Sequence, residues 1–231
     1  IALIGDGAYV LVAHQSLGIS STADLIALAK SKPGQIAYAS SSIGNLTHLA
    51  AELFNSLAGI RMLHVPYKGG NPAMTDLLGG RVSVFFSTVA VARPHLQSGK
   101  IKGLGVTTAR RTLALPNLPT IAESGLPGYE VSGWYGLVAP AATTKAVIAR
   151  LHGAVQGAQR QPDIREKLLG VGVEVGRRGR VETQERGARA AELLWQLQTP
   201  KQRDGTELDV RRLVGRAEED RRRRAHDTPM R

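Results

Sequence analysis

The sequence predicts an α/β fold for its first 176 residues, where short apolar strands alternate with amphipathic helices. The strand segments are rich in Val, Leu, Phe and Tyr, and the helical segments repeat their apolar residues at helical spacing. Pro and Gly separate the two kinds of segment. Strands that alternate with helices of about ten residues are typical of βαβ units, whose sheet is mainly parallel and covered on both faces.

The expected elements follow in order along the chain. Strands are predicted over residues 9–13, 36–39, 61–65, 82–86, 102–106 and 131–138. Helices are predicted over residues 25–30, 47–57, 71–78, 92–97, 145–159 and 162–169. Ser21 or Thr22 can cap the first helix, and Thr143 or Thr144 the fifth. Residues 113–128 hold three prolines and are predicted to cross irregularly between two lobes.

Composition limits the classes of protein that need to be considered. The chain has 231 residues, 42% of them hydrophobic, which is enough to bury a core. It has no cysteine, which excludes disulfides, thiolate metal sites and cysteine nucleophiles. No apolar run approaches the ~20 residues of a membrane-spanning helix, and no charged-then-apolar signal segment is visible. These features predict a soluble globular protein.

The net charge of +11 would ordinarily suggest a nucleic-acid partner, but its distribution weakens that interpretation. Half of the 30 Lys and Arg residues lie in 177–231, an Arg-rich tail expected to be disordered or loosely helical. The tail matches no base-reading module. A basic-tail nucleic-acid binder therefore remains an alternative that rests on sequence-independent phosphate attraction, and no specific nucleic acid is expected.

A serine-rich turn is the strongest candidate site. It follows the strand predicted at 36–39 and contains Ser40, Ser41, Ser42, Gly44 and Asn45. The first amides of a helix have no intrahelical partner and the helix dipole is positive there, so this turn can hold a carboxylate or a phosphate. An equally good interpretation from composition alone is that these residues only cap a helix and fill a turn.

Other chemistries find little support. Gly5-Asp6-Gly7 lacks the third glycine of a dinucleotide fingerprint and precedes a strand, and neither an HExxH nor a GxSxG pattern occurs. His48 and His64 are interpreted as hydrogen-bonded structural residues. The sequence therefore predicts no catalytic residue, no metal site and no cofactor. An α/β enzyme acting on a small anionic substrate remains an alternative, because the fold alone does not separate it from a receptor.

Several short motifs, taken in order, resemble those of the Bug family, the TctC-like receptors of tripartite tricarboxylate transporters. The matching stretches are YASS with Gly44 and HLA within 38–50, HVPYKGG at 64–70, TDLLGG at 75–80, PH at 94–95, LPNLPT at 115–120, GLPGY at 125–129 and WYG at 134–136. Their order and spacing between residues 11 and 175 make the resemblance specific.

The resemblance implies a type II periplasmic-binding-protein-like architecture of two α/β lobes. Such a protein is not an enzyme: it captures a small di- or tricarboxylate in the periplasm and delivers it to membrane permease subunits, as a monomer. The resemblance also implies a ligand role for the serine turn, and a second loop with Tyr67, Lys68 and Gly69 matches another loop at the same sheet edge. The family often has Asp-Asn at the point occupied here by Ser87 and Thr88.

Two departures from the family pattern suggest the domain organisation. The family's opening strand and glycine-rich loop have no match, so residues 1–10 are expected to be a remnant of lobe 1 and residues 11–130 an intact lobe 2. Residues 131–176 would return to lobe 1, and the divergent tail covers 177–231. With the first lobe incomplete, we expect this truncated chain to bind its ligand weakly or not at all by itself.

Overall fold

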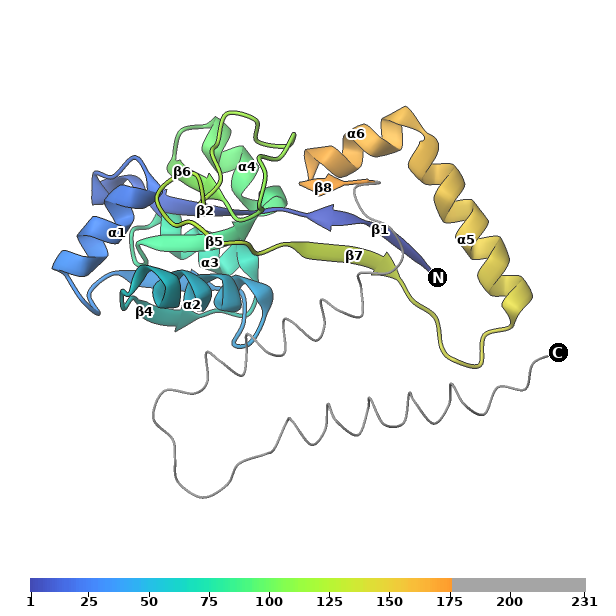
Figure 1. Ribbon diagram of the computed structural model, residues 1–231, viewed down its shortest axis with the longest axis horizontal. Coiled ribbons are helices and arrows are strands. Elements are labelled where there is room, and N and C mark those ends of the chain that lie inside the picture. The colour runs from blue at the N-terminus through green and yellow to red at the C-terminus, as the bar shows by residue number, and fades with distance from the viewer. Residues whose placement is uncertain (176–231) are drawn as a thin grey trace, which may run out of the picture. The chain divides into compact units, whose positions relative to one another are not determined.

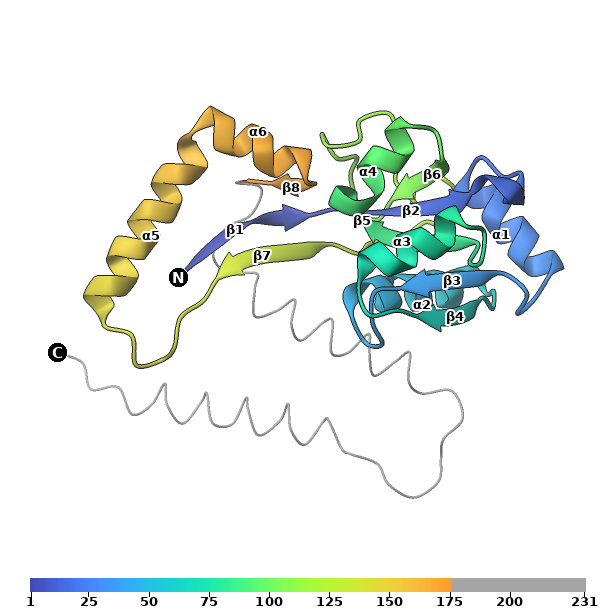
Figure 2. The ribbon, with the colours of Figure 1, turned by 180° about the vertical axis from the view of Figure 1, so that it is seen from behind.

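The structure is a computed structural model that describes residues 1–175 (Figures 1 and 2). The tail predicted over residues 177–231 lies outside this range. Within it, no helix is both long and apolar enough to cross a membrane.

The larger of two sheets has five strands. They are β2 (Tyr9–His14), β3 (Ala37–Ser40), β4 (Leu63–Pro66), β5 (Val84–Thr88) and β6 (Ile101–Val106), in the spatial order β4-β3-β5-β2-β6. β3 is parallel to both β4 and β5, as expected of βαβ units, whereas β2 is antiparallel to β5 and β6. The predicted parallel arrangement therefore applies to four of the five strands. β2 runs the other way because the chain enters it from another strand and not from a returning helix.

Helices cover both faces of this sheet. They are α1 (Thr22–Ser31), α2 (Leu46–Ala58), α3 (Gly70–Leu78) and α4 (Val89–Gln97), and a short 3-10 helix, η1 (Gln15–Leu17), follows β2. One buried cluster joins α1 and α2 to the sheet, and a second joins α3 and α4 to the opposite face. Successive residues of β2 belong alternately to the two clusters, and Leu11 and Val12 are both fully buried.

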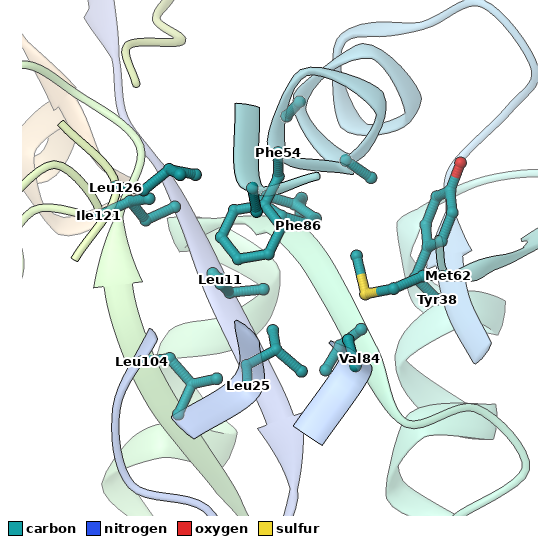
Figure 3. Close-up of a cluster of buried hydrophobic side chains, with 14 of the residues drawn as sticks. Leu11, Leu25, Tyr38, Phe54, Met62, Val84, Phe86, Leu104, Ile121 and Leu126 are labelled. Carbon is teal, nitrogen blue, oxygen red and sulfur yellow. The ribbon is translucent and has the colours of Figure 1, made fainter. Parts of the chain in front are cut away.

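The cluster under α1 and α2 has an aromatic centre (Figure 3). The ring centroids of Phe54 and Phe86 lie 5.6 Å apart in an edge-to-face arrangement, and that of Tyr129 lies 6.0 Å from Phe54. The Tyr129 hydroxyl donates to the carbonyl of Ala50 at 2.9 Å, which satisfies its buried polar group. This contact ties the irregular segment after β6 to α2.

Residues 113–128, predicted to cross between lobes, instead pack against the five-stranded sheet. Ile121 and Leu126 belong to the core cluster, and Thr120 forms a parallel bridge with Val106 at the end of β6. The segment has no helix or strand of its own, as its prolines indicated, but its apolar side chains are buried. Proline and glycine residues indicate that a segment has an irregular backbone, but they do not indicate which part of the protein the segment packs against.

The smaller sheet was only partly predicted. Its strands are β1 (Ala2–Gly7), β7 (Gly133–Leu137) and β8 (Val173–Glu174), all antiparallel, in the order β7-β1-β8. Two helices, α5 (Lys145–Arg160) and α6 (Pro162–Gly170), lie between β7 and β8 in the chain. β7 matches the predicted strand, whereas β1 and β8 were missed, because Gly and Asp interrupt β1 and β8 is only two residues long.

Two adjacent chain segments connect the sheets (Figures 1 and 2). β1 passes into β2 through Ala8, and the chain returns from Val131 into β7 at Gly133, which pairs with Gly7. A Cβ atom on Gly7 would lie 2.5 Å from Cε2 of Tyr135, so the close pairing requires glycine there. β2 begins at Tyr9, and the domain boundary predicted after residue 10 therefore falls inside this strand.

Candidate functional site

Three helices begin at one edge of the five-stranded sheet. The parallel strands β3, β4 and β5 lead into α2, α3 and α4 respectively, so the three helix N-termini share the carboxyl edge of the sheet. β2 runs the other way and begins at the same edge, where Tyr9 pairs with Thr88. The crossing from β1 therefore passes beside the three N-termini, whose dipoles favour a negative group.

The serine turn is held by a chain of hydrogen bonds. Asn45 caps α2: its Oδ1 accepts from the backbone N–H of His48 at 3.2 Å and from the Thr47 hydroxyl at 2.7 Å. Thr47 Oγ1 in turn accepts from the backbone N–H of Ser41 at 2.8 Å. Gly44 has a φ of +76°, a left-handed conformation that glycine adopts without strain. The turn is thus hydrogen-bonded to the first residues of the helix that it precedes.

Members of the serine turn differ in exposure. Ser40 is fully buried: its hydroxyl donates to the carbonyl of Ser42 at 3.2 Å and lies 2.6 Å from Nε2 of His64. Ser41 is half-buried, and Ser42 and Gly44 are exposed. The outer residues of the turn, and not Ser40, are therefore open to a ligand.

The loop after β4 is bonded to the serine turn. The backbone N–H groups of Tyr67 and Gly69 donate to the carbonyls of Ser40 and Ser41 at 2.9 and 2.8 Å. Gly70, the first residue of α3, faces the turn, because a Cβ atom there would lie 3.6 Å from Ser41 Oγ and 3.4 Å from a methyl of Val91 in α4. The structure thus brings the first two predicted loops together, with α4 alongside.

Tyr67 and Lys68 differ in what they contact. The Tyr67 hydroxyl donates to Oδ2 of Asp76 at 2.7 Å, and Arg81 pairs with the other carboxylate oxygen at 2.7 Å. The Tyr67 bond, followed by the Arg81 bond, lowers the pKa of Asp76, while burial and the Asp76 hydrogen bond raise the pKa of Tyr67 to about 12. Tyr67 is therefore anchored to α3, whereas the side chain of Lys68 is exposed.

Ser87 and Thr88 end β5 at the same edge. Ser87 is fully buried and donates to the carbonyl of Thr88 at 3.1 Å. Thr88 occupies the cap position of α4, is half-buried, and makes no side-chain capping bond. Thr88 is the more accessible of the two.

Behind the serine turn lie two stacked histidines to which the sequence analysis assigned only a structural role. The rings of His48 and His64 are nearly parallel with their centroids 4.0 Å apart, and the Tyr38 ring lies beside both, 4.9 Å from His64 and 6.4 Å from His48. The Tyr38 hydroxyl donates to Glu52 Oε1. Each histidine bonds a residue of the turn, as predicted for hydrogen-bonded residues, but their mutual contact joins α2 to β4 and had no signal in the sequence.

The described residues contain no set of side chains that could ligate a metal ion. Among residues 1–175, no group of three or more His, Asp or Glu side chains is placed to hold a metal ion. The arrangement at the sheet edge is instead one of backbone amides, hydroxyls and helix ends. Such a set binds an anion without covalent chemistry.

A mixed α/β sheet, two adjacent crossings and helix N-termini that converge beside them are the architecture of the solute-binding class of proteins. The sequence model of the tripartite tricarboxylate transporter family receptors, TctC, matches residues 1–187. The chain belongs to this family of periplasmic receptors, which confirms the resemblance and the fold class predicted from the sequence.

Relatives and solved structures agree with this assignment. The chain is 38% identical to the UPF0065 protein in the tcbD-tcbE intergenic region of Pseudomonas sp. strain P51, over 71% of this chain and 49% of that protein. It is 33% identical to protein BugT of Bordetella pertussis, over 74% of this chain and 53% of BugT. The chain thus spans about half the length of the curated relatives it matches.

Two solved structures were determined with ligands. R. palustris Rpa4515 with adipate superimposes with a TM-score of 0.77 at 33% identity, covering 84% of this chain and 65% of that one. MatC from Rhodopseudomonas palustris with bound malate gives a TM-score of 0.69 at 26% identity, covering 84% of this chain and 66% of that one. Both ligands are small dicarboxylates.

Proposed function

We propose that this protein is a periplasmic receptor that captures a small di- or tricarboxylate and delivers it to the membrane permease subunits of a tripartite tricarboxylate transporter. The observation that carries the proposal is the convergence of three helix N-termini on the carboxyl edge of one sheet, beside the two crossings. The adipate and malate of the two solved neighbours are of the same chemical class. The receptor acts as a monomer without a cofactor.

In this proposal the predicted site residues have two roles. Direct contact with the carboxylate comes from the accessible groups around the edge. These are Ser41, Ser42, Asn45, Lys68 and Thr88, whereas the N–H groups of Gly44 and Gly69 already donate to His48 and Ser41 and so shape the two loops. The buried hydroxyls of Ser40 and Ser87 and the anchored Tyr67 hold those groups in place.

The enzyme alternative would depend on Ser40, whose Oγ lies 2.6 Å from His64 Nε2 like an activated nucleophile. Ser40 is fully buried, however, and its hydroxyl is directed at the carbonyl of Ser42. A nucleophile must reach the substrate carbon. The geometry therefore favours binding over catalysis.

The test is a residue-resolved titration of the ¹⁵N-labelled 231-residue chain with adipate, malate and citrate, using adipamide as the neutral control. We expect the amide signals of residues 41–45, 69–71 and 88–90 to move with at least one carboxylate and not with adipamide. Because backbone signals report even weak binding, the readout suits the low affinity expected for this chain. Shifts confined to Arg-rich segments, or shifts of equal size with adipamide, would contradict the proposal.

A further inference from the structure

His48 occupies an unusual place in the cap of α2. It is the third helical residue, and its Nδ1 accepts a hydrogen bond from the backbone N–H of Gly44 at 3.1 Å, while its own N–H donates to Asn45 Oδ1. The arrangement is a variant of the capping box: the third residue reaches back to the chain before the helix, but it bonds Gly44, the residue before the cap Asn45. The conformation of the serine turn therefore depends on the His48 ring.

Helix α1 shows the usual version of the same device. Asp24 is its third helical residue, and its carboxylate accepts from the backbone N–H groups of Ser20 and Ser21 at 2.9 and 3.0 Å. A carboxylate keeps its acceptor oxygens at every pH above its low pKa. An imidazole does not, since protonation turns Nδ1 from an acceptor into a donor.

The Gly44 bond therefore fixes the protonation state of His48. A backbone N–H can only donate, so Nδ1 of His48 must carry a lone pair and its proton must lie on Nε2. Protonation of Nδ1 would leave two donors, the Gly44 N–H and the new Nδ1–H of His48, facing each other at 3.1 Å with no acceptor between them. The turn would then lose the bond that holds Gly44 in position.

The surroundings of His48 reinforce the neutral state. Partial burial lowers the pKa of the His48 ring, and Glu52, one turn further along α2, opposes that shift in part. From β4, His64 stacks on His48, and its own pKa is lowered by burial and then by His48. From β3, Tyr38 lies beside both histidine rings and donates a hydrogen bond to the Glu52 carboxylate, which engages the group that opposes the shift.

We propose that His48 is a positioning residue that holds the serine turn in its ligand-binding conformation only while its ring is neutral, with His64 stacked behind it as support, so that acidification weakens carboxylate capture. This inference rests on the proposed function for its ligand. Its structural half, the loss of the Gly44 bond on protonation, is independent of any ligand.

Electrostatic attraction would change the affinity in the opposite direction. A positive His48 would attract an anion near the turn, and on charge alone acidification would strengthen binding. We expect geometry to outweigh charge, because the groups that hold a carboxylate must converge and the Gly44 bond sets the direction of the turn that carries them. The sign of the pH effect on affinity therefore separates a positioning role from an electrostatic one.

The decisive variant is His48→Asn. The asparagine Oδ1 stands where Nδ1 stands and accepts from Gly44, but it does not titrate. His48→Ala removes the acceptor at every pH, and rescue by Asn shows that the acceptor, and not the ring, is required. His14→Asn is the matched control, because His14 Nδ1 also accepts a backbone N–H, that of Ser16, but at the far end of β2.

The first measurement needs no ligand. In the 231-residue chain, the Gly44 amide signal and the His48 ring nitrogens are followed by NMR from pH 8 to pH 5. We expect them to titrate together in wild type and in His14→Asn, and the Gly44 signal to stay still in His48→Asn. A Gly44 signal that moves equally in wild type and His48→Asn overturns the proposal even if no carboxylate ever binds.

The second measurement is the affinity for adipate over the same range. We expect the wild-type affinity to fall as the pH falls, by up to about tenfold per pH unit for one linked proton. His48→Asn should show only the decline caused by adipate's own titration, which all variants share. An affinity that rises on acidification in wild type, or equal pH profiles in wild type and His48→Asn, would overturn the coupling to capture.

Discussion

Single residues decide the shape of the serine turn, and Gly44 is the clearest case. Its φ of +76° lies in the left-handed region, and no atom lies within 4 Å of the place a Cβ would take. A substitution there meets strain in the backbone and no steric clash. Gly44→Ala should therefore lower the free energy of unfolding only through the strain of holding an alanine in the left-handed backbone conformation.

We expect Gly44→Ala to destabilise the protein by about 1–2 kcal/mol, the usual cost of a left-handed conformation for an L-residue. The matched control is Gly153→Ala in α5, which also has nothing within 4 Å but has ordinary helical geometry. This change should stabilise by up to about 1 kcal/mol. Urea unfolding of both variants measures the difference, and equal effects would contradict the conformational argument.

Asp76 carries a pH dependence that can be traced to its neighbours. Its lowered pKa means that the folded protein binds a proton less readily than the unfolded chain, so the stabilisation is full above the ordinary Asp range near pH 4 and is lost as the pH falls through the lowered value. The hydrogen bond from Tyr67 is the largest cause and that from Arg81 the second.

Removing the Tyr67 hydroxyl should therefore raise the pKa of Asp76. We expect Tyr67→Phe to shift the carboxylate titration of Asp76, followed by ¹³C NMR, toward the ordinary value, while Arg81 keeps part of the depression. Tyr135→Phe is the control, because Tyr135 lies on β7 in the other sheet. An unchanged Asp76 titration in Tyr67→Phe would mean that Arg81 alone sets it.

At the scale of elements, α2 joins the site to the core. Its first turn carries the cap and the His48 bond, and its inner face buries Phe54 completely against Phe86 and Tyr129. Damage to this face should therefore affect the whole five-stranded sheet and not the helix alone.

Truncation of Phe54 tests that link. We expect Phe54→Ala to cost about 3–5 kcal/mol, because a fully buried ring leaves a cavity that its neighbours only partly fill. Leu57→Ala on the same helix is the control: Leu57 is 46% exposed, and its loss should cost under about 1 kcal/mol. Chemical denaturation of the two variants provides the comparison, and similar losses would mean that α2 is not held by its inner face.

At the scale of the whole molecule, burial is uneven between the two sheets. β2 and β5 lie in the middle of the larger sheet and their side chains are almost all buried, whereas α5 has no buried residue at all. The contacts that hold α5 include bonds from Gln159 Nε2 to the carbonyls of Leu3 and Ile4. Local opening should therefore begin in α5 and in α6, which likewise has no buried residue.

Hydrogen exchange measured by mass spectrometry can test this order. We expect peptides from β2 and β5 to exchange slowest and those from α5 and α6, neither of which has a buried residue, to exchange fastest among the long helices of the described region. Exchange in α5 as slow as in β2 would show that α5 is covered in solution.

Much of this fold is local and could be predicted from the sequence. The apolar run of β2, the Ser21 cap of α1 and the glycine after α2 each act on residues a few positions away, and the strands and helices of the larger sheet appear within a few residues of the expected places. The serine turn was identified for the same reason, since a strand, a turn and a capped helix are consecutive in the chain.

The sequence by itself thus determined the α/β class, the family and the position of the serine turn. Only the tertiary structure decided that β2 runs antiparallel, that Ser40 is buried, and that His48 meets His64. The physical reason is that strand direction, burial and ring stacking depend on contacts between segments far apart in the chain. No local periodicity records which distant segment will lie beside a given residue, and the packing of α2 on β3 and β5, which brings its first turn beside β4, was needed to show it.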